Sequence, residues 1–153
     1  MIKLIMASLM LLFGAEQALA DAREDCEKMS GDAAIAACSE AIRRNPKDAD
    51  AYSNRSYEYL RKGDHDRAIA DASKAIELNP KHAYAYFRRG FAYGAKGDHD
   101  RSIAEYTKAI EINPKIKEAY LNRGFTYASK GDFDRAIADY TKSIESDPRY
   151  APA

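Results

Sequence analysis

The chain has 153 residues, of which 46% are apolar and 31% are charged, and its 24 Lys and Arg residues balance its 24 Asp and Glu residues. This balance leaves no excess of positive charge for the wide basic surface on which nucleic-acid binding relies, so we expect no nucleic-acid partner. The apolar content excludes a compositionally disordered chain, and the length suits one domain with an adequate core.

Residues 1–20 have the pattern of a secretory signal peptide. Lys3 gives a positive start, Leu4 to Phe13 form a ten-residue apolar stretch, and Ala18 and Ala20 supply the small residues of a cleavage site. The apolar stretch is shorter than the roughly 20 residues that span a bilayer, which disfavours the alternative of a retained anchor. We therefore expect cleavage after Ala20, export to a bacterial periplasm or out of the cell, and no membrane insertion of the mature chain.

The two cysteines, Cys26 and Cys38, lie on either side of a short turn at residues 29–32. In an oxidising compartment two cysteines usually pair, so the expected export favours a structural disulfide between them. Two buried thiols are the alternative. A metal site has less support, because two thiolates without a histidine nearby in the sequence fall short of four ligands.

The rest of the sequence repeats with a period of 34 residues. Prolines and glycines keep this spacing at Pro46, Pro80, Pro114, Pro148, Gly63, Gly97 and Gly131. Residues 83–116 and 117–150 are identical at nineteen of thirty-four aligned positions, which marks a true internal repeat. Such a repeat decides the architecture before any local pattern does.

Each repeat unit indicates two helices and no strand. A Gly-Asp pair in the middle of the unit predicts that one helix ends in the left-handed conformation and that Asp caps the next. Asn-Pro closes the second helix, since Asn tolerates a positive φ and Pro bars continuation. The expected helices span residues 49–62, 65–78, 83–96, 99–112, 117–130 and 133–146.

The side-chain pattern indicates how these helices pack. Small and aromatic residues recur at i, i+4 and i+7, so paired helices approach closely, and the pairs must stack to bury their apolar faces. Opposite charges also recur at i, i+4 along the second helices, and we expect ordinary exposed pairs there. These pairs are Arg67/Asp71, Arg101/Glu105 and Arg135/Asp139.

This pattern resembles the tetratricopeptide repeat (TPR) family. The resemblance covers residues 49–150 and rests on the period, on aromatic-x3-small-x2-Tyr in first helices, on small-x3-aromatic/Ala-x2-small in second helices, and on the closing Pro. It implies an all-α, right-handed helix-turn-helix solenoid of three full repeats, at 49–82, 83–116 and 117–150, followed by a tail at 151–153. Residues 21–48 fit a degenerate repeat that caps the N-terminal end and is cross-linked by the expected disulfide.

The resemblance further implies a concave groove that binds peptide segments of partner proteins. The expected groove residues are Asn54, Tyr57, Tyr84, Phe87, Arg88, Phe91, Asn122 and Phe125. Packing against neighbouring helices is the alternative for the aromatic members, whereas Asn54, Arg88 and Asn122 share one register and could bond a partner's backbone or carboxylates. Family members that clamp chaperone C-termini use Lys, Asn, Asn, Lys and Arg. The matching positions here differ, being Ser53, Tyr57, Arg88, Glu118 and Asn122, so we do not expect that activity.

His65 and His99 lie in repeated Gly-Asp-His-Asp segments, which raises the hypothesis of a metal site. The third copy carries Phe133 at the matching position, so packing beside a capping Asp explains the pattern better, and we expect no metal. The sequence contains no Gly-x-Ser-x-Gly, phosphate-loop or His-Glu-x-x-His motif. We therefore expect neither an enzyme nor a cofactor.

These patterns together predict an exported module that binds protein or peptide segments. One alternative is self-assembly as a homo-oligomer, because no polar capping helix follows Pro148, which leaves Ile137, Tyr140 and Ile144 of the last helix partly bare. An alternative of another class is a periplasmic metal- or small-molecule-binding protein that uses the two repeated histidines.

Overall fold

The computed structural model describes residues 2–146, and side chains for residues 16–146. All regular structure in this range is helical, which confirms the all-α fold class. The helices are α1 (Ile2–Lys28), α2 (Gly31–Arg44), α3 (Ala49–Arg61), α4 (His65–Leu78), α5 (Ala83–Ala95), α6 (His99–Ile112), α7 (Lys117–Ser129) and α8 (Phe133–Glu145). From α3 onward each helix begins at the expected residue and ends there or one residue earlier. The expected tail at 151–153, Pro148 and the side chains of Lys3 and residues 4–13 lie outside the described residues.

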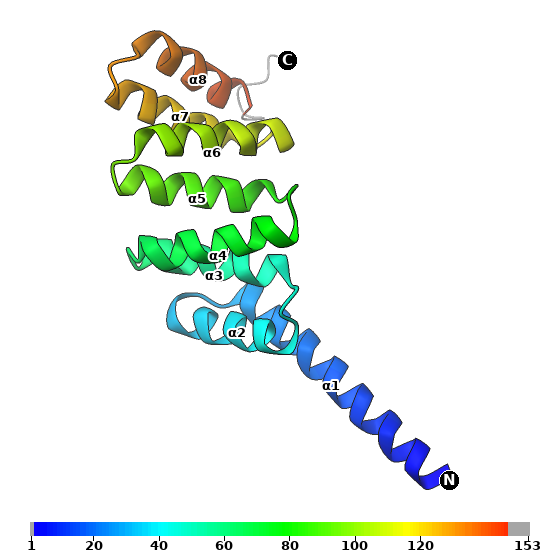
Figure 1. The fold of residues 1–153 in the computed structure, drawn as a ribbon. Coiled ribbons are helices and arrows are strands. Elements are labelled where there is room, and N and C mark those ends of the chain that lie inside the picture. Colours follow the sequence, from blue (N-terminus) through cyan, green and yellow to red (C-terminus); the bar gives the residue numbers. More distant parts are fainter. Residues whose placement is uncertain (1, 147–153) are drawn as a thin grey trace.

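The helices stack in pairs. Consecutive helices contact each other throughout, and further contacts join α1 to α3, α3 to α5 and α5 to α7. In the described part of the chain, the even-numbered helices do not contact one another. The odd-numbered helices are therefore crowded along the inner side of the stack, and the even-numbered helices spread along the outer side. Figure 1 shows the helices stacked along one direction, with the first part of α1 extending away from the stack.

The Gly-Asp turns between paired helices have the expected geometry. Gly63, Gly97 and Gly131 have φ angles of 74°, 81° and 81°, which side chains with a Cβ rarely adopt. The next residue caps the following helix: the Asp64 carboxylate accepts a hydrogen bond from the Arg67 backbone N–H at 3.1 Å, and the later repeats do the same. Glycine and aspartate therefore fix each turn together.

The Asn-Pro turns differ from the expectation. Asn79 and Asn113 have φ angles of −137° and −139°, so neither uses the left-handed conformation that we expected of them. The Asn79 backbone N–H instead donates to the Ala75 carbonyl, and its side-chain oxygen accepts a bond from the Lys81 N–H at 3.0 Å. Asparagine is suited to this position because its side chain bonds the backbone two residues on.

Small residues let the paired helices approach closely. Ala68, Ala72 and Ala75 of α4 are fully buried, and the Ser56 hydroxyl of α3 donates to the Ala68 carbonyl at 2.8 Å. In the last pair, a Cβ added at Gly124 would lie 2.9 Å from the Tyr140 ring. The stack therefore requires residues without bulk at the points where its helices cross.

One arginine in each full repeat connects three helices. In the first full repeat, Arg55 of α3 donates two hydrogen bonds to the Asp71 carboxylate of α4, at 2.7 and 2.8 Å, and one to the Ser39 hydroxyl of α2 at 2.9 Å. The same partners recur 34 residues on as Arg89 with Glu105 and Ser73, where Nη2 alone bonds both carboxylate oxygens, and the full arrangement recurs as Arg123 with Asp139 and Thr107. These bridges hold each pair together and attach it to the pair before.

The bridges correct our expectation of exposed pairs along the second helices. Asp71 and Asp139 are buried, with 7% and 6% of their surface exposed, and neither bonds the arginine four residues before it. Those arginines, such as Arg67, bond the capping aspartate instead and lie over a tyrosine ring of the preceding helix. A carboxylate facing the core at this register therefore signals a bridge, not a solvated surface.

The N-terminal pair is fastened by a disulfide between Cys26 of α1 and Cys38 of α2, with their Cα atoms 4.6 Å apart. The two cysteines are buried with Ala22, Ala41 and Ala51, which joins α1 and α2 to α3. Within the described residues, no helix combines the length and the apolar character that crossing a membrane would need.

We predict that replacing both cysteines, as Cys26→Ser/Cys38→Ser, lowers the free energy of unfolding by about 3 kcal/mol, because the bond closes a short loop in the unfolded chain. Urea unfolding followed by circular dichroism measures the change, with the wild-type chain under oxidising conditions as reference. Equal midpoints for the two proteins would contradict a stabilising role of the bond.

Candidate functional site: the inner face of the stack

The inner face carries two adjoining hollows. The hollow between α3 and α5 has a volume of about 260 Å³, and the hollow on the α5–α7 side, which α6 also lines, about 180 Å³. The first, which we call the α3–α5 hollow, is lined by Tyr57, Leu60, Arg61, Phe87, Arg88 and Phe91. The second, the α5–α7 hollow, is lined by Phe91, Gly94, Ala95, His99, Tyr106, Asn122, Phe125 and Thr126. Phe91 belongs to both, so the two hollows form one continuous surface.

Most of the expected aromatic groove residues are exposed. Tyr57 and Tyr84 are 48% and 49% exposed, and Phe91 and Phe125 are 41% and 68% exposed. Packing against neighbouring helices therefore does not cover these four rings. Phe87 behaves differently, because it is partly buried and its ring lies 5.7 Å from that of Tyr106. The α3–α5 hollow is therefore lined by one partly buried ring, Phe87, and by two exposed rings, Tyr57 and Phe91.

Arg88 lies beside the α3–α5 hollow and bonds neutral groups. Its Nη1 donates to the Ser53 hydroxyl and, at 3.4 Å, to the Asn54 side-chain oxygen. Its guanidinium carbon lies 5.4 Å from the centre of the Tyr57 ring and 5.9 Å from that of Tyr84. Four of the expected groove residues thus meet at one point: Asn54, Tyr57, Tyr84 and Arg88.

Among the residues that the structure describes, no carboxylate lies within ion-pair distance of the Arg88 guanidinium. Burial lowers the pKa of Arg88 to about 10, and the field of the neighbouring tyrosines opposes this only in part. For Arg55 and Arg123, in contrast, the hydrogen bonds that each guanidinium donates to its bridging aspartate raise the pKa of the arginine. The inner face therefore holds one partly buried cation that the fold itself does not neutralise.

The expected asparagines contribute unequally. Asn122 lines the α5–α7 hollow, and its side-chain nitrogen donates to the Glu118 carbonyl of its own helix at 2.7 Å. Asn54 supports Arg88 and lines neither hollow. The shared register of Asn54, Arg88 and Asn122 therefore does not produce three equivalent binding groups.

Comparison with known families supports the architecture described above. Tetratricopeptide repeat models match residues 30–83, 54–115 and 118–150, which is most of the chain. The chain belongs to the tetratricopeptide repeat family. No curated protein matches it significantly.

Solved TPR structures share the fold of this TPR protein. MamA is similar with a TM-score of 0.76 and 28% identity, over 90% of this chain and 80% of MamA. YrrB, described as a TPR protein with an unusual peptide-binding site, is similar with a TM-score of 0.66 and 23% identity, over 77% of this chain and 61% of YrrB. The second TPR of Spaghetti (RPAP3), solved with the HSP90 peptide SRMEEVD, has a TM-score of 0.64 and 20% identity, over 67% of this chain and 95% of that one.

The sequence did not indicate several residues of this TPR surface. Leu60 and Arg61 line the α3–α5 hollow three and four residues after Tyr57, a spacing that places them on the same helix face. His99 and Tyr106 line the α5–α7 hollow although both lie on α6. The repeat period shows which helix face turns inward, but it does not show how far a second helix reaches between two first helices.

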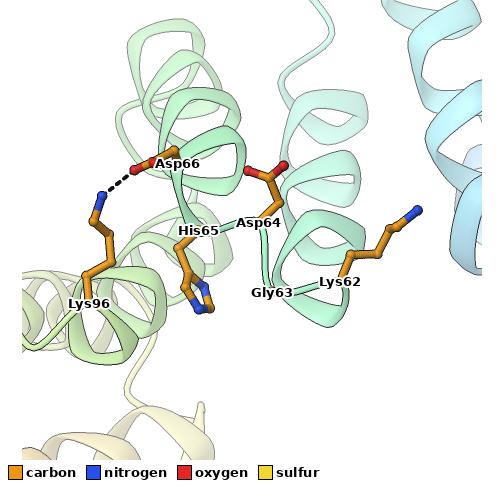
Figure 2. Close-up of a pocket in the computed structure, with 6 residues that line it drawn as sticks. All are labelled: Lys62, Gly63, Asp64, His65, Asp66 and Lys96. Carbon is orange, nitrogen blue, oxygen red and sulfur yellow. Dashed lines mark hydrogen bonds and ion pairs between the residues drawn. The ribbon is translucent and has the colours of Figure 1, made fainter.

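The repeated Gly-Asp-His-Asp turn forms a separate hollow of about 420 Å³ at the edge of the stack, lined by Lys62, Gly63, Asp64, His65, Asp66 and Lys96. Figure 2 shows the ring of His65 pointing away from both neighbouring carboxylates, while Lys96 reaches Asp66. Across the described residues, no three His, Cys, Asp or Glu side chains are placed to hold a metal ion.

We predict different effects for two similar substitutions on the first helices. Arg55→Gln should lower the free energy of unfolding by about 3 kcal/mol, because Asp71 loses its buried partner. Arg88→Gln should leave stability unchanged or raise it, since it removes a charge that burial disfavours. Burial of the Arg88 charge lowers the stability of the folded wild-type chain. Because the pKa of Arg88 is lower in the folded than in the unfolded chain, this loss of stability decreases as the pH rises through about 10.

Urea unfolding of the two variants beside wild type measures both effects. A loss of stability in Arg88→Gln as large as that in Arg55→Gln would contradict the view that Arg88 has no acidic partner among the described residues.

Proposed function

We propose that this TPR protein is an interaction module that binds a peptide segment of a partner protein across the two hollows of its inner face. The observation that supports this best is the set of exposed aromatic rings over these hollows, above all Tyr57, Phe91 and Phe125. Contiguous exposed aromatic surface is unusual in a monomer and is typical of interaction sites.

The architecture supports binding with little rearrangement. The arginine bridges and buried small residues hold the odd-numbered helices in fixed positions, so the surface exists before a partner arrives. A preorganised surface loses little conformational entropy on binding, and the aromatic rings supply apolar area at low entropic cost. Two of the structures that share the fold, YrrB and the second TPR of RPAP3, are described with peptide sites or bound peptides. TPR proteins are in general scaffolds without catalytic activity, and we propose the same here.

We predict that Tyr57→Ala/Phe91→Ala abolishes capture of the partner in a crosslinking pull-down from native extract, measured by quantitative mass spectrometry. Both side chains are exposed, so the variant should keep its helical circular dichroism. The loss should exceed tenfold, since each ring contributes on the order of 1–2 kcal/mol when it becomes buried in an interface.

The matched control is Phe133→Ala/Ile137→Ala on α8, which removes similar exposed apolar area away from the hollows. Capture that is equal for wild type and Tyr57→Ala/Phe91→Ala, but lost in the α8 variant, would place the interface at the end of the stack and reject the proposed groove.

Self-assembly through α8 is the second candidate function. Phe133, Ile137 and Ile144 lie on one face of this helix and are 65%, 63% and 55% exposed. A face of this kind is suited to a second copy of the chain, because stacked repeats bury such faces against a neighbour. Sedimentation of wild type and of the α8 variant over a range of concentrations tests the idea, and a wild-type chain that stays monomeric rejects it.

We also propose that the protein is exported, on the basis of the signal-peptide pattern in residues 1–20 and the Cys26–Cys38 disulfide. A chain isolated from its native cells that begins at Asp21 would support export, and one that retains residues 1–20 would contradict it.

A further inference from the structure

The arginines of the inner helices differ in one respect. Arg55, Arg61, Arg89 and Arg123 each bond a carboxylate, and Arg88 is the remaining arginine of α3, α5 and α7. Among the described residues, no carboxylate lies within ion-pair distance of Arg88, whose polar partners are Ser53 and Asn54. Arg88 also departs from the repeat, because the same register carries asparagine in the other two units. The middle repeat therefore holds a cation that the architecture does not require.

The nearest acidic groups are already engaged. Asp50 and Glu58 act on Arg88 only through their longer-range field. Asp50 lies 3.1 Å from His82, and Glu58 accepts a hydrogen bond from the Gly31 backbone N–H at 2.7 Å and pairs with Arg61. Neither carboxylate can move to Arg88 without breaking these contacts.

The contacts of Arg88 hold its guanidinium in place and leave one edge of it available to a ligand. Both bonds to neutral groups use Nη1, so Nε and Nη2 have no partner within the described chain. The rings of Tyr57 and Tyr84 lie against the guanidinium, which restricts its movement and favours its charge. A planar guanidinium with one free edge binds a carboxylate through two parallel hydrogen bonds.

Charge and apolar surface occur together in the α3–α5 hollow. Its walls are Tyr57, Leu60, Phe87 and Phe91, and its cations are Arg61 and Arg88. We propose that this hollow receives a peptide segment that places an Asp or Glu carboxylate on Arg88 and a neighbouring large apolar side chain against the aromatic walls. The inference rests on the proposed function and adds the chemistry of the ligand, because a carboxylate would neutralise the cation that the fold leaves unpaired.

The test uses random peptides displayed on phage, selected against the full chain. Wild type should enrich peptides with Asp or Glu beside a large apolar residue. For one enriched peptide made synthetically, either Arg88→Gln in the protein or replacement of the acid by its amide in the peptide should weaken binding about tenfold. The two changes together should weaken it no more than either alone, as expected of groups that bond each other.

The matched control is Arg43→Gln on α2, which removes the same charge from an exposed side chain paired with Glu40. It should leave affinity unchanged. The peptide-side replacement keeps the test decisive even if Arg88→Gln were to unfold, since it leaves the protein intact.

The outcomes separate this inference from the proposed function. Enriched peptides without acidic preference, whose binding still falls in Tyr57→Ala/Phe91→Ala, would overturn the carboxylate assignment and keep the groove. If wild type enriches no peptide, or only peptides that Tyr57→Ala/Phe91→Ala binds equally well, both the carboxylate assignment and the proposed groove would be overturned. A concentration-dependent dimer that Arg88→Gln dissociates would show a second copy as the occupant and overturn the assignment to a partner peptide.

Discussion

The stack depends on one bridging side chain in each repeat. An arginine in the middle of a first helix bonds the acid of its own second helix and the hydroxyl of the preceding second helix, so one planar group connects three helices. The guanidinium matches the carboxylate in geometry, which fixes the relative position of the helices as well as holding them together. Because the same contact recurs at 34-residue spacing in Arg55, Arg89 and Arg123, every full repeat joins its neighbour in the same way.

This arrangement separates the residues that build the fold from those available for binding. Each bridging arginine bonds its acid inside the stack, and the closest crossings are filled by alanine, serine and glycine. The exposed aromatic side chains of the inner face are therefore not needed to hold the helices together, whereas Phe87 packs against Tyr106. Tyr57, Phe91 and Phe125 remain exposed over two hollows, and Arg88 is left as the one inner cation without an acid in the described chain. Surface that the fold does not use is where a partner can gain binding free energy.

The sequence predicted the architecture closely because its strongest signals are periodic and local. Repeated Gly-Asp pairs set the turns, and the helix bounds followed from them to within one residue. Two local interpretations were wrong. Asn79 has an extended backbone because its side chain can bond the chain two residues on, and Asp71 faces Arg55 across the pair, not Arg67 on its own helix. Spacing along one helix could not reveal a partner sixteen residues away on another. For the same reason, the sequence indicated Tyr57 and Phe91 as groove residues but not His99, whose place depends on how α6 lies behind α5 and α7.

The two ends of the stack differ in what holds them. The first pair is cross-linked by Cys26 and Cys38, whereas the last helix, α8, contacts α7 alone in the described chain and exposes Ile137 and Ile144. In a linear array each layer is stabilised only by its neighbours, and α8 has a single neighbouring helix among the described residues, so we expect opening to begin there. We therefore expect the stack to open from one end. Amide hydrogen exchange should be fastest in α8 and slower towards the middle layers. At the cross-linked end it should stay slower than in α8. A partner held over α3 and α5 would therefore sit on the side of the stack that stays closed longest.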